Sequence, residues 1–339
     1  HRMPIFHCMR LMAFSDLHLD APFARGGPVL AAFRRSQLRD GLTEIVRLAI
    51  EHRVDALLCD GDLYEHDRFT PDTAQLLQRL FAELAPIPVF LAPGNHDWYG
   101  PASIYAGATW TPNVTVFTEG RLVADDSLEG VRLWGAAHLA PSGTPGLLDG
   151  FRTDGTAIHL GLFHGSELGG WMRESDADKV QHAPFRASQL PDSGLAHAVV
   201  GHHHRRTEGR HHTYPGCPVP LAFGDAGDGG AVLLELDDAG SVTSRTWHRV
   251  TRFDVHDLTV ELDGCADSGE LERRVDDAVA GRLGIARITL AGELAPTLAL
   301  DVLLLAERRG GLADLSVRLG DVTSGYDLER VGVEPTVRG

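Results

Sequence analysis

Five short polar clusters in the first two-thirds of the chain carry side chains that commonly bind metal ions. Each cluster comes at the end of an apolar run, and they are Ser15-Asp16-Leu17-His18, Gly61-Asp62-Leu63, Gly94-Asn95-His96-Asp97, His164-Gly165 and Gly201-His202-His203-His204. Carboxylate and amide oxygens mixed with imidazole nitrogens suit two divalent transition metals such as manganese, with zinc and iron as weaker alternatives. Two such ions, ~3.5–4 Å apart, can stabilise the attacking and leaving oxygens of a phosphoester displacement. Together the clusters predict a metal-dependent phosphoesterase.

Each cluster taken alone has an ordinary structural explanation. Gly-Asp is a frequent turn dipeptide, a single histidine such as His164 is often structural, and the chain has 18 histidines, so one run of three is not surprising. The shared context favours a site, because strand-like apolar runs precede four of the clusters. These runs are VDALLCD, PVFLAP, AIHLGLF and AHAVV. Polar donors repeated at so many strand ends indicate one assembled metal site.

Helical and extended segments alternate in the first part of the chain. Apolar residues at helical spacing predict one helix over 35–53 and another over 73–84. The strand-like runs VDALLCD and PVFLAP follow these helices in turn. This strand–helix–strand succession predicts a layered α/β sheet whose strand ends carry the site. From about Asn113 onward strands become more frequent, which predicts a two-sheet β-sandwich flanked by helices.

A change in composition near Thr251 predicts a second domain. Its expected elements are a strand over 251–262, a helix over 268–283 opened by a Ser268 cap, a strand over 286–294, a helix over 297–310 and a strand over 312–322. We therefore expect one domain over residues 1–250, containing the metal site, and a small α+β domain over residues 251–339.

The order of the clusters resembles the calcineurin-like metallophosphoesterase superfamily. Within it, the segments MRLMAFSDLHLDAPF and HTYPGCPVPLAFGDAGDGGAVLLEL resemble the SbcD-type DNA repair exonucleases, and HLDAPF resembles the YhaO-type branch more than SbcD itself. The family usually has serine where Cys217 stands here, which is a departure outside the expected ligands. The resemblance covers nearly the whole chain. It implies the metallophosphoesterase fold, with the C-terminal domain acting as a cap over the site.

The resemblance also implies a ligand set for each of two ions. One ion would be held by Asp16, His18, Asp62 and His204, and the other by Asp62, Asn95, His164 and His202. Asp62 would then bridge the ions, and His203 would be a spacer between two ligands that point the same way from an extended loop. The ions, expected to be Mn²⁺, would lower the pKa of bound water toward ~7 and so supply a hydroxide nucleophile.

His96 is the candidate general acid, because it directly follows the expected ligand Asn95 and can lie at the edge of the metal pair. A protonated imidazole there would stabilise the phosphorane-like charge or protonate the leaving 3′ oxygen, an effect typically worth ~10²–10⁴-fold in rate. A purely structural role is the alternative for His96. Asp97 is expected to orient a neighbouring group.

Three functions are compatible with these motifs. The resemblance implies a Mn²⁺-dependent DNA nuclease, a 3′→5′ exonuclease with single-strand endonuclease activity, in DNA repair or end processing. The same metal pair could instead hydrolyse a small nucleotide or other phosphodiester. A phosphoprotein substrate is disfavoured, because G-D-x-x-D-R-G and G-N-H-E read GDLYEHDRF and GNHD here. The third function, a non-catalytic docking subunit, is disfavoured because every expected ligand position is filled.

Composition bears on partners and compartment. The longest apolar runs fall short of the ~20 residues that span a bilayer, so no membrane partner is expected. Scattered cysteines without a C-x-x-C pair fit a reducing cytoplasm. The net charge of −16 would repel DNA at long range. Two local basic groups exist, Arg34, Arg35 and Arg39 on an expected helix and Arg205, Arg206 and Arg210 after the histidine run. Those near the site are candidate phosphate contacts, and solvated surface arginines are the alternative for both groups. DNA binding is therefore expected to depend on a partner, and the resemblance implies an SbcC-type ATPase subunit and pairing as a homodimer.

Overall fold

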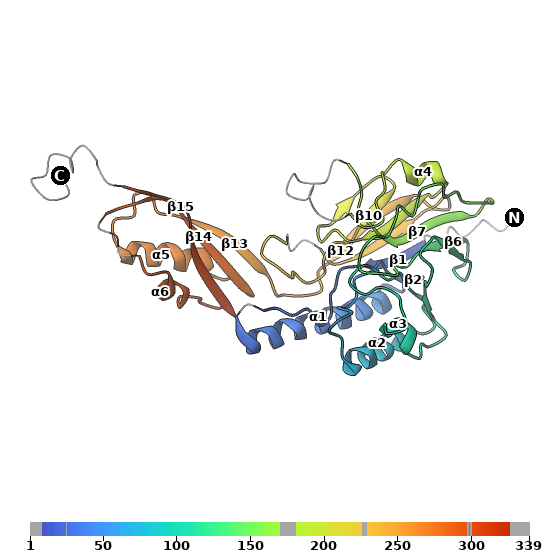
Figure 1. Ribbon diagram of the computed structural model, residues 1–339, viewed down its shortest axis with the longest axis horizontal. Coiled ribbons are helices and arrows are strands. Elements are labelled where there is room, and N and C mark those ends of the chain that lie inside the picture. Colours follow the sequence, from blue (N-terminus) through green and yellow to red (C-terminus); the bar gives the residue numbers. More distant parts are fainter. Residues whose placement is uncertain are drawn as a thin grey trace, which may run out of the picture. The chain divides into compact units, whose positions relative to one another are not determined.

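The computed structural model describes residues 9–24, 26–169, 181–225, 229–296, 298 and 300–325. These residues divide into two compact units (Figure 1), one within His1–Leu221 and Asp225–Thr251 and the other within Ala222–Gly224 and Arg252–Gly339. All five polar clusters belong to the first unit. Within the described ranges, no helix has both the length and the apolar character needed to cross a membrane.

The first unit contains two six-stranded sheets. The first sheet consists, in spatial order, of β12 (Val242–His248), β11 (Ala231–Leu236), β1 (Met9–Phe14), β2 (Ala56–Cys59), β3 (Val89–Leu91) and β4 (Val114–Val116). The strands β1 to β4 are parallel, whereas β11 pairs antiparallel with both β1 and β12. Because β1, β2 and β3 are parallel, the loops that follow them leave the same edge of the sheet.

The second sheet is also parallel at its centre. Its spatial order is β5 (Val123–Asp125), β6 (Val131–Gly135), β7 (Ile158–His164), β8 (His197–Gly201), β10 (His212–Tyr214) and β9 (Thr207–Glu208). The strands β6, β7, β8 and β10 are parallel, and the edge strands β5 and β9 are antiparallel to their neighbours. The register places His164, at the end of β7, opposite Gly201, at the end of β8.

The two sheets share one hydrophobic core. Leu58 and Phe90 of the first sheet and Leu133 and Leu162 of the second are fully buried in the same cluster. Burying each such side chain contributes roughly 1.5–3 kcal/mol relative to leaving it exposed. This shared core confirms the predicted two-sheet sandwich.

Helices flank the sandwich, as predicted. They are α1 (Gly27–Glu51), α2 (Pro71–Glu83), α3 (Ile104–Gly107) and α4 (Gln189–Ser193). Figure 1 shows α1, α2 and α3 on the side of β1 and β2, and α4 on the side of β7 and β10. The helix predicted over 35–53 begins earlier, at Gly27, with proline in its first turn. The helix predicted over 73–84 begins at Pro71, after Thr70 caps it by accepting a hydrogen bond from the backbone N–H of Thr73.

The second unit is a strand–helix–strand–helix–strand module with its own core. Its elements are β13 (Val255–Glu261), α5 (Ser268–Val279), β14 (Ile285–Leu294), α6 (Val302–Ala306) and β15 (Asp314–Ser324). The three strands form a parallel sheet in the order β13-β14-β15. Val275 of α5 and Ile288 of β14 are fully buried in a cluster confined to this unit.

Two local predictions for this module were wrong. The cap of α5 is Asp267 and not Ser268, since the Asp267 side chain accepts from the backbone N–H of Glu270 at 2.9 Å. A carboxylate also interacts favourably with the positive end of the helix dipole. The helix predicted over 297–310 is shorter in the structure, where α6 covers Val302–Ala306. It begins after Asp301, because the Asp301 side chain caps its first turn. Thr297 and Ala299, within that predicted helix, lie outside the described residues.

Candidate metal centre

The polar clusters meet at the carboxyl ends of five strands. The seven expected ligands follow or end these strands in the order Asp16 and His18 (β1), Asp62 (β2), Asn95 (β3), His164 (β7), and His202 and His204 (β8). In open sheets of parallel strands, this edge is where ligands usually bind. The structure thus brings side chains that are far apart in the sequence to one region.

One group of metal-binding atoms joins the two sheets. Single ligand atoms of Asp16, Asp62 and His164 lie within 4.8 Å of one another, and all three residues are buried. The Nε2 atom of His164 is 3.2 Å from Asp62 Oδ2. Its Nδ1 atom donates to the backbone oxygen of Asp60 at 2.9 Å. Since a carbonyl oxygen can only accept, a neutral His164 carries its proton on Nδ1 and presents Nε2 as the ligand nitrogen.

A second group consists of Asp16, His18 and His204, whose ligand atoms also lie within 4.8 Å of one another. His18 is oriented by Glu65, because its Nδ1 atom is 2.7 Å from Glu65 Oε1. Its Nε2 atom is buried, lies 3.7 Å from Asp62 Oδ2 and has no hydrogen-bond partner. A buried nitrogen without a hydrogen-bond partner destabilises the fold by about 1–3 kcal/mol. A metal ion bound to Nε2 would supply the missing partner.

Asn95 and His202 lie beside these groups without belonging to them. Asn95 Oδ1 is 3.1 Å from His164 Nε2. The backbone N–H of His202 donates to both carboxylate oxygens of Asp16 at 3.2 Å, and the His202 ring centre is 5.2 Å from that of His164. The ring of the intervening His203 lies 4.8 Å from Tyr214. Asn95 and His202 are therefore close to His164, as expected for ligands of the ion that it would hold.

Several of these residues have left-handed backbone conformations. The φ angles of Asp16, His18 and Asp62 are +53°, +50° and +52°. Non-glycine residues held in such conformations cost of order 1–3 kcal/mol each. Backbone hydrogen bonds from Asp16 N to Gly61 O (3.0 Å) and from His18 N to Asp62 O (2.9 Å) hold the loops in place. The loops after β1 and β2 therefore constrain each other, which positions these three candidate ligands.

Asp97 orients the neighbouring loops. Its buried carboxylate accepts hydrogen bonds from the backbone N–H groups of Asp62, Leu63 and Gly94, at 3.1, 2.7 and 2.6 Å, and from the hydroxyl of Tyr105 at 2.5 Å. A single side chain thus connects the loops after β2 and β3. This contact pattern agrees with the orienting role expected for Asp97.

The electrostatics of the site favour cations. Burial opposes ionisation of Asp62, but the nearby His164 and His18 together hold its pKa below the usual range. Burial also opposes protonation of His164, yet Asp62 and Asp16 raise its pKa to about 10. Asp60, which was not predicted as a site residue, adds a buried carboxylate without a hydrogen-bond partner. Its pKa is raised by burial and by Asp16. Bound cations would offset this accumulation of acidic groups.

The donor set fits a pair of divalent ions. Oxygen donors come from Asp16, Asp62 and Asn95, and nitrogen donors from His18, His164, His202 and His204. When bound, such ions act as Lewis acids on a phosphoester and activate water at neutral pH. The protein contributes by fixing the ligand atoms through Asp97, Glu65 and the paired loops.

His96 lies at the margin of this set. Its side chain is 47% exposed, whereas His18, whose ring centre is 4.6 Å away, is buried. The backbone N–H of His96 donates to Asp62 Oδ1 at 2.8 Å. Its Nδ1 atom is 3.1 Å from Glu65 Oε2. That hydrogen bond raises the pKa of His96 to about 9, although burial opposes the shift. An exposed imidazolium anchored in this way can donate a proton to a bound substrate.

Glu65 is a residue that the motif analysis missed. Its two oxygens contact the Nδ1 atoms of His18 and His96, at 2.7 and 3.1 Å. Burial favours its neutral form, but these two hydrogen bonds lower the pKa of Glu65 to about 2. The comparison with G-D-x-x-D-R-G contained the signal, because Glu65 stands where that motif has its second aspartate.

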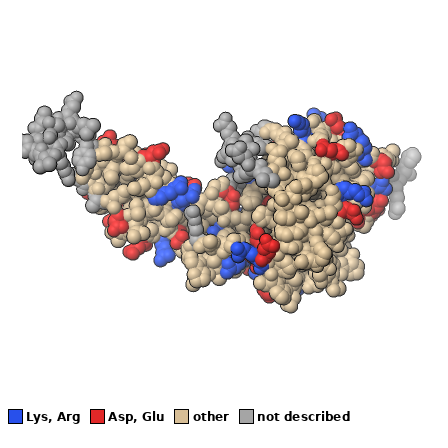
Figure 2. All heavy atoms as spheres, in the orientation of Figure 1, with Lys and Arg blue, Asp and Glu red and all other residues tan. Residues whose placement is uncertain are grey.

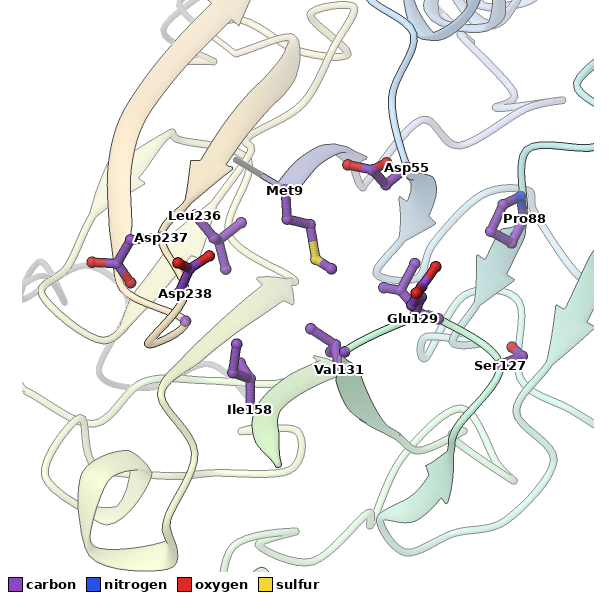
Figure 3. Close-up of a pocket in the computed structure, with 13 residues that line it drawn as sticks. Met9, Asp55, Pro88, Ser127, Glu129, Val131, Ile158, Leu236, Asp237 and Asp238 are labelled. Atoms are coloured by element: carbon purple, nitrogen blue, oxygen red, sulfur yellow. The ribbon is translucent and has the colours of Figure 1, made fainter. Parts of the chain in front are cut away.

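A pocket of about 690 Å³ lies at the opposite ends of the same strands (Figure 3). Its lining includes Met9, Val131 and Ile158, the first residues of β1, β6 and β7. Acidic residues, including Glu129 and Asp238, contribute to the lining, and basic residues do not. A pocket of this charge repels phosphates, so we assign no phosphoester chemistry to it.

The chain matches a family model and is similar to several solved structures. A family model described as calcineurin-like phosphoesterase matches residues 9–206. Among solved structures, the chain is similar to TT1561 of Thermus thermophilus, with 14% identity, 72% of this chain and 100% of that chain covered, and a TM-score of 0.43. It is also similar to a dimetal phosphatase from Danio rerio, with 12% identity, coverage of 68% and 93%, and a TM-score of 0.40.

The family model covers more than half of the chain and includes all seven expected ligands and His96. Members of this family are metal-dependent phosphoesterases with a dinuclear centre of divalent ions, and the clusters described above are candidates to hold it. The chain therefore belongs to the calcineurin-like phosphoesterase family and is a metal-dependent phosphoesterase.

Proposed function

We propose that this phosphoesterase is a Mn²⁺-dependent nuclease that hydrolyses phosphodiester bonds in DNA. The observation that carries diester hydrolysis is the placement of His96. It is half-exposed beside buried metal-binding residues, and its hydrogen bond to Glu65 raises its pKa to about 9. Cleavage of a diester releases an alkoxide, and an acid at the margin of the metal pair can protonate it. A non-catalytic docking subunit would not require an acid at this position.

DNA is proposed as the substrate because the motifs resemble the SbcD-type nucleases. Arg205 and Arg206 follow the expected ligand His204 directly and are exposed. The Arg206 guanidinium lies 5.1 Å from the centre of the Trp247 ring, which restrains its position. Exposed arginines within two residues of a metal ligand are suited to contact the backbone of a bound strand.

Charge favours a second candidate, a phosphodiesterase acting on a small nucleotide or other diester. The net charge of the chain is −16. Figure 2 shows the coloured Lys and Arg residues in small groups among Asp and Glu, and the visible face has no broad basic patch. Proteins that bind DNA alone usually present such a patch. A nuclease with this surface would depend on a partner for DNA affinity.

The proposal therefore includes an SbcC-type ATPase subunit, pairing as a homodimer, and a capping role for the second unit. We also propose that the protein is located in a reducing cytoplasm, in keeping with free thiols at Cys59, Cys217 and Cys265. Manganese is preferred because oxygen and imidazole donors suit it.

A substrate panel tests the proposal. The metal-free chain is reloaded with Mn²⁺ and incubated with labelled single-stranded, double-stranded and hairpin DNA, and with bis-p-nitrophenyl phosphate. We expect DNA cleavage by the intact chain and none by Asp62→Ala, because the expected bridging carboxylate is lost. Glu83→Gln, an exposed position on α2, is the matched control and should keep full activity. Hydrolysis of the small diester without cleavage of any DNA would favour the second candidate.

A further inference from the structure

A third set of metal-binding side chains lies next to the candidate centre. It consists of His204, Cys217 and Asp225, and single ligand atoms of these residues lie within 4.8 Å of one another. His204 Nδ1 is 3.4 Å from Asp225 Oδ1. In a tetrahedral zinc site, bond lengths of ~2.3 Å to sulfur and ~2.0–2.1 Å to nitrogen or oxygen place ligand atoms about 3.3–3.6 Å apart. The observed spacing therefore requires only a small adjustment to hold an ion.

Backbone contacts bring these residues together. The N–H of Cys217 donates to the backbone oxygen of His204 at 2.8 Å. This close approach depends on Gly216, whose φ is +76°. A Cβ atom at Gly216 would lie 2.6 Å from Arg206 N and 3.0 Å from His204 O, so a larger residue would separate the two segments. The turn thus holds Cys217 against the end of the histidine run.

The carboxylate of Asp225 is also oriented. Its Oδ2 atom accepts from the backbone N–H of Leu221 at 2.8 Å, which leaves Oδ1 facing His204. Cys217 is 3% exposed, and its Sγ atom donates to the backbone oxygen of Val219 at 2.8 Å. The His204 side chain is 36% exposed, so ions can reach the group from solvent. Hydrogen bonds that fix ligands in this way are typical of sites that bind metal ions.

We propose that His204, Cys217 and Asp225 form an additional site for a thiolate-binding divalent cation such as Zn²⁺, with water as the fourth ligand and with His204 shared with the candidate dinuclear centre. On binding, the S–H bond of Cys217 breaks, a bond from sulfur to the ion forms, and the proton passes to water. His204 binds the ion through the lone pair of Nδ1, so the ring proton is carried by Nε2. A thiolate selects zinc over manganese, so this site and the dinuclear centre prefer different metals. His204 belongs to both groups. Because a neutral imidazole has only one free nitrogen lone pair, His204 binds an ion in one of the two sites at a time, and this couples their occupancy.

Cobalt spectroscopy tests the site independently of enzymatic activity. Co²⁺ added to the metal-free full chain should give the near-ultraviolet charge-transfer band of a thiolate ligand, since nitrogen and oxygen ligands do not produce it. Cys217→Ser should remove the band, whereas Cys265→Ser and Cys8→Ser should keep it. Absence of the band in the unmodified chain would overturn the proposal, and so would its persistence in Cys217→Ser.

Zinc stoichiometry gives a second measurement. After gel filtration, elemental analysis should find one zinc ion fewer per chain in Cys217→Ser than in the unmodified chain. Asp225→Asn should weaken zinc binding by at least about 10-fold. Equal zinc content and affinity in all three proteins would contradict the site. The cobalt band should persist in Asp62→Ala, so failure of this proposal is distinguishable from failure of the nuclease proposal.

Discussion

The two ends of the parallel strands use buried histidines in opposite ways. At the carboxyl ends, His164 closes β7 beside Asp62 and Asp16, which raise its pKa to about 10. At the amino ends, His197 begins β8, where burial, followed by the charge of Arg245, lowers its pKa to about 3. Both side chains are almost completely buried. The difference shows that neighbouring charge, and not burial alone, decides whether a histidine here favours a positive charge.

The carboxylates at the two ends of the strands differ in their burial. At the carboxyl ends, Asp16 and Asp62 are buried, and left-handed loops hold them in place. At the amino ends, Glu129 and Asp238 are exposed around a pocket. Exposed carboxylates are solvated and need no cation, whereas buried ones must be paired or coordinate metal ions. Of these two regions, the carboxyl ends are therefore the candidate for catalysis.

The largest effect is expected from His96→Asn. The change removes the candidate acid and leaves the ligands intact, so kcat should fall ~10²–10⁴-fold while both metals are retained. Kinetics together with elemental analysis would measure this. His203→Asn, a neighbouring histidine outside the donor groups, serves as control. Equal loss of metal from the His96 variant would mean that His96 is a ligand.

A smaller loss is expected from Glu65→Gln. The variant keeps the size of the side chain but removes the charge that orients both His18 and His96. Changes at such orienting residues typically cost about 10–100-fold in metal affinity or activity. Manganese titration and kinetics would be compared with those of Glu83→Gln. Unchanged values would show that Glu65 has only a structural role.

The pH dependence of stability should reveal the lowered pKa of His197 in the folded protein. Its folded pKa of about 3 lies below the unfolded value of about 6.5. The unfolded chain therefore binds a proton first as the pH falls, and stability present above pH ~6.5 is lost progressively toward pH ~3. At pH 5 the loss is about 2 kcal/mol.

Urea unfolding of the metal-free protein at pH 7 and pH 5 would measure this loss. In His197→Gln the loss of stability between pH 7 and pH 5 should be smaller by about 2 kcal/mol, because glutamine does not take up a proton. An identical loss in both proteins would argue against a neutral buried His197.

The smallest effect is expected at the amino ends. Glu129→Gln and Asp238→Asn change exposed carboxylates, so stability should stay within about 0.5 kcal/mol of the unmodified chain. Activity should change little, because the site is at the other end of the strands. A marked loss of activity would mean that the pocket takes part in function.

Much of the candidate site could be predicted because each candidate ligand belongs to a short motif at a strand end. The strand-like runs before Asp62, Asn95 and His164 became β2, β3 and β7. Glu65 was missed because its importance depends on contacts with His18 and His96, which lie in other clusters. The cap at Asp267 was misassigned because Ser268, the next residue, is an equally good cap by type.

The sequence by itself determined the order of strands and helices and the residue types that can bind metals, because periodicity and local motifs depend on neighbouring residues. Only the tertiary structure decided which donors share a pocket, how Glu65 orients two histidines, and that Cys217 lies beside His204 and Asp225. These relations join distant segments, as in the contact between Asp16 and His202, which are 186 residues apart. They follow from the parallel pairing of strands and the packing of two sheets, which no local pattern encodes.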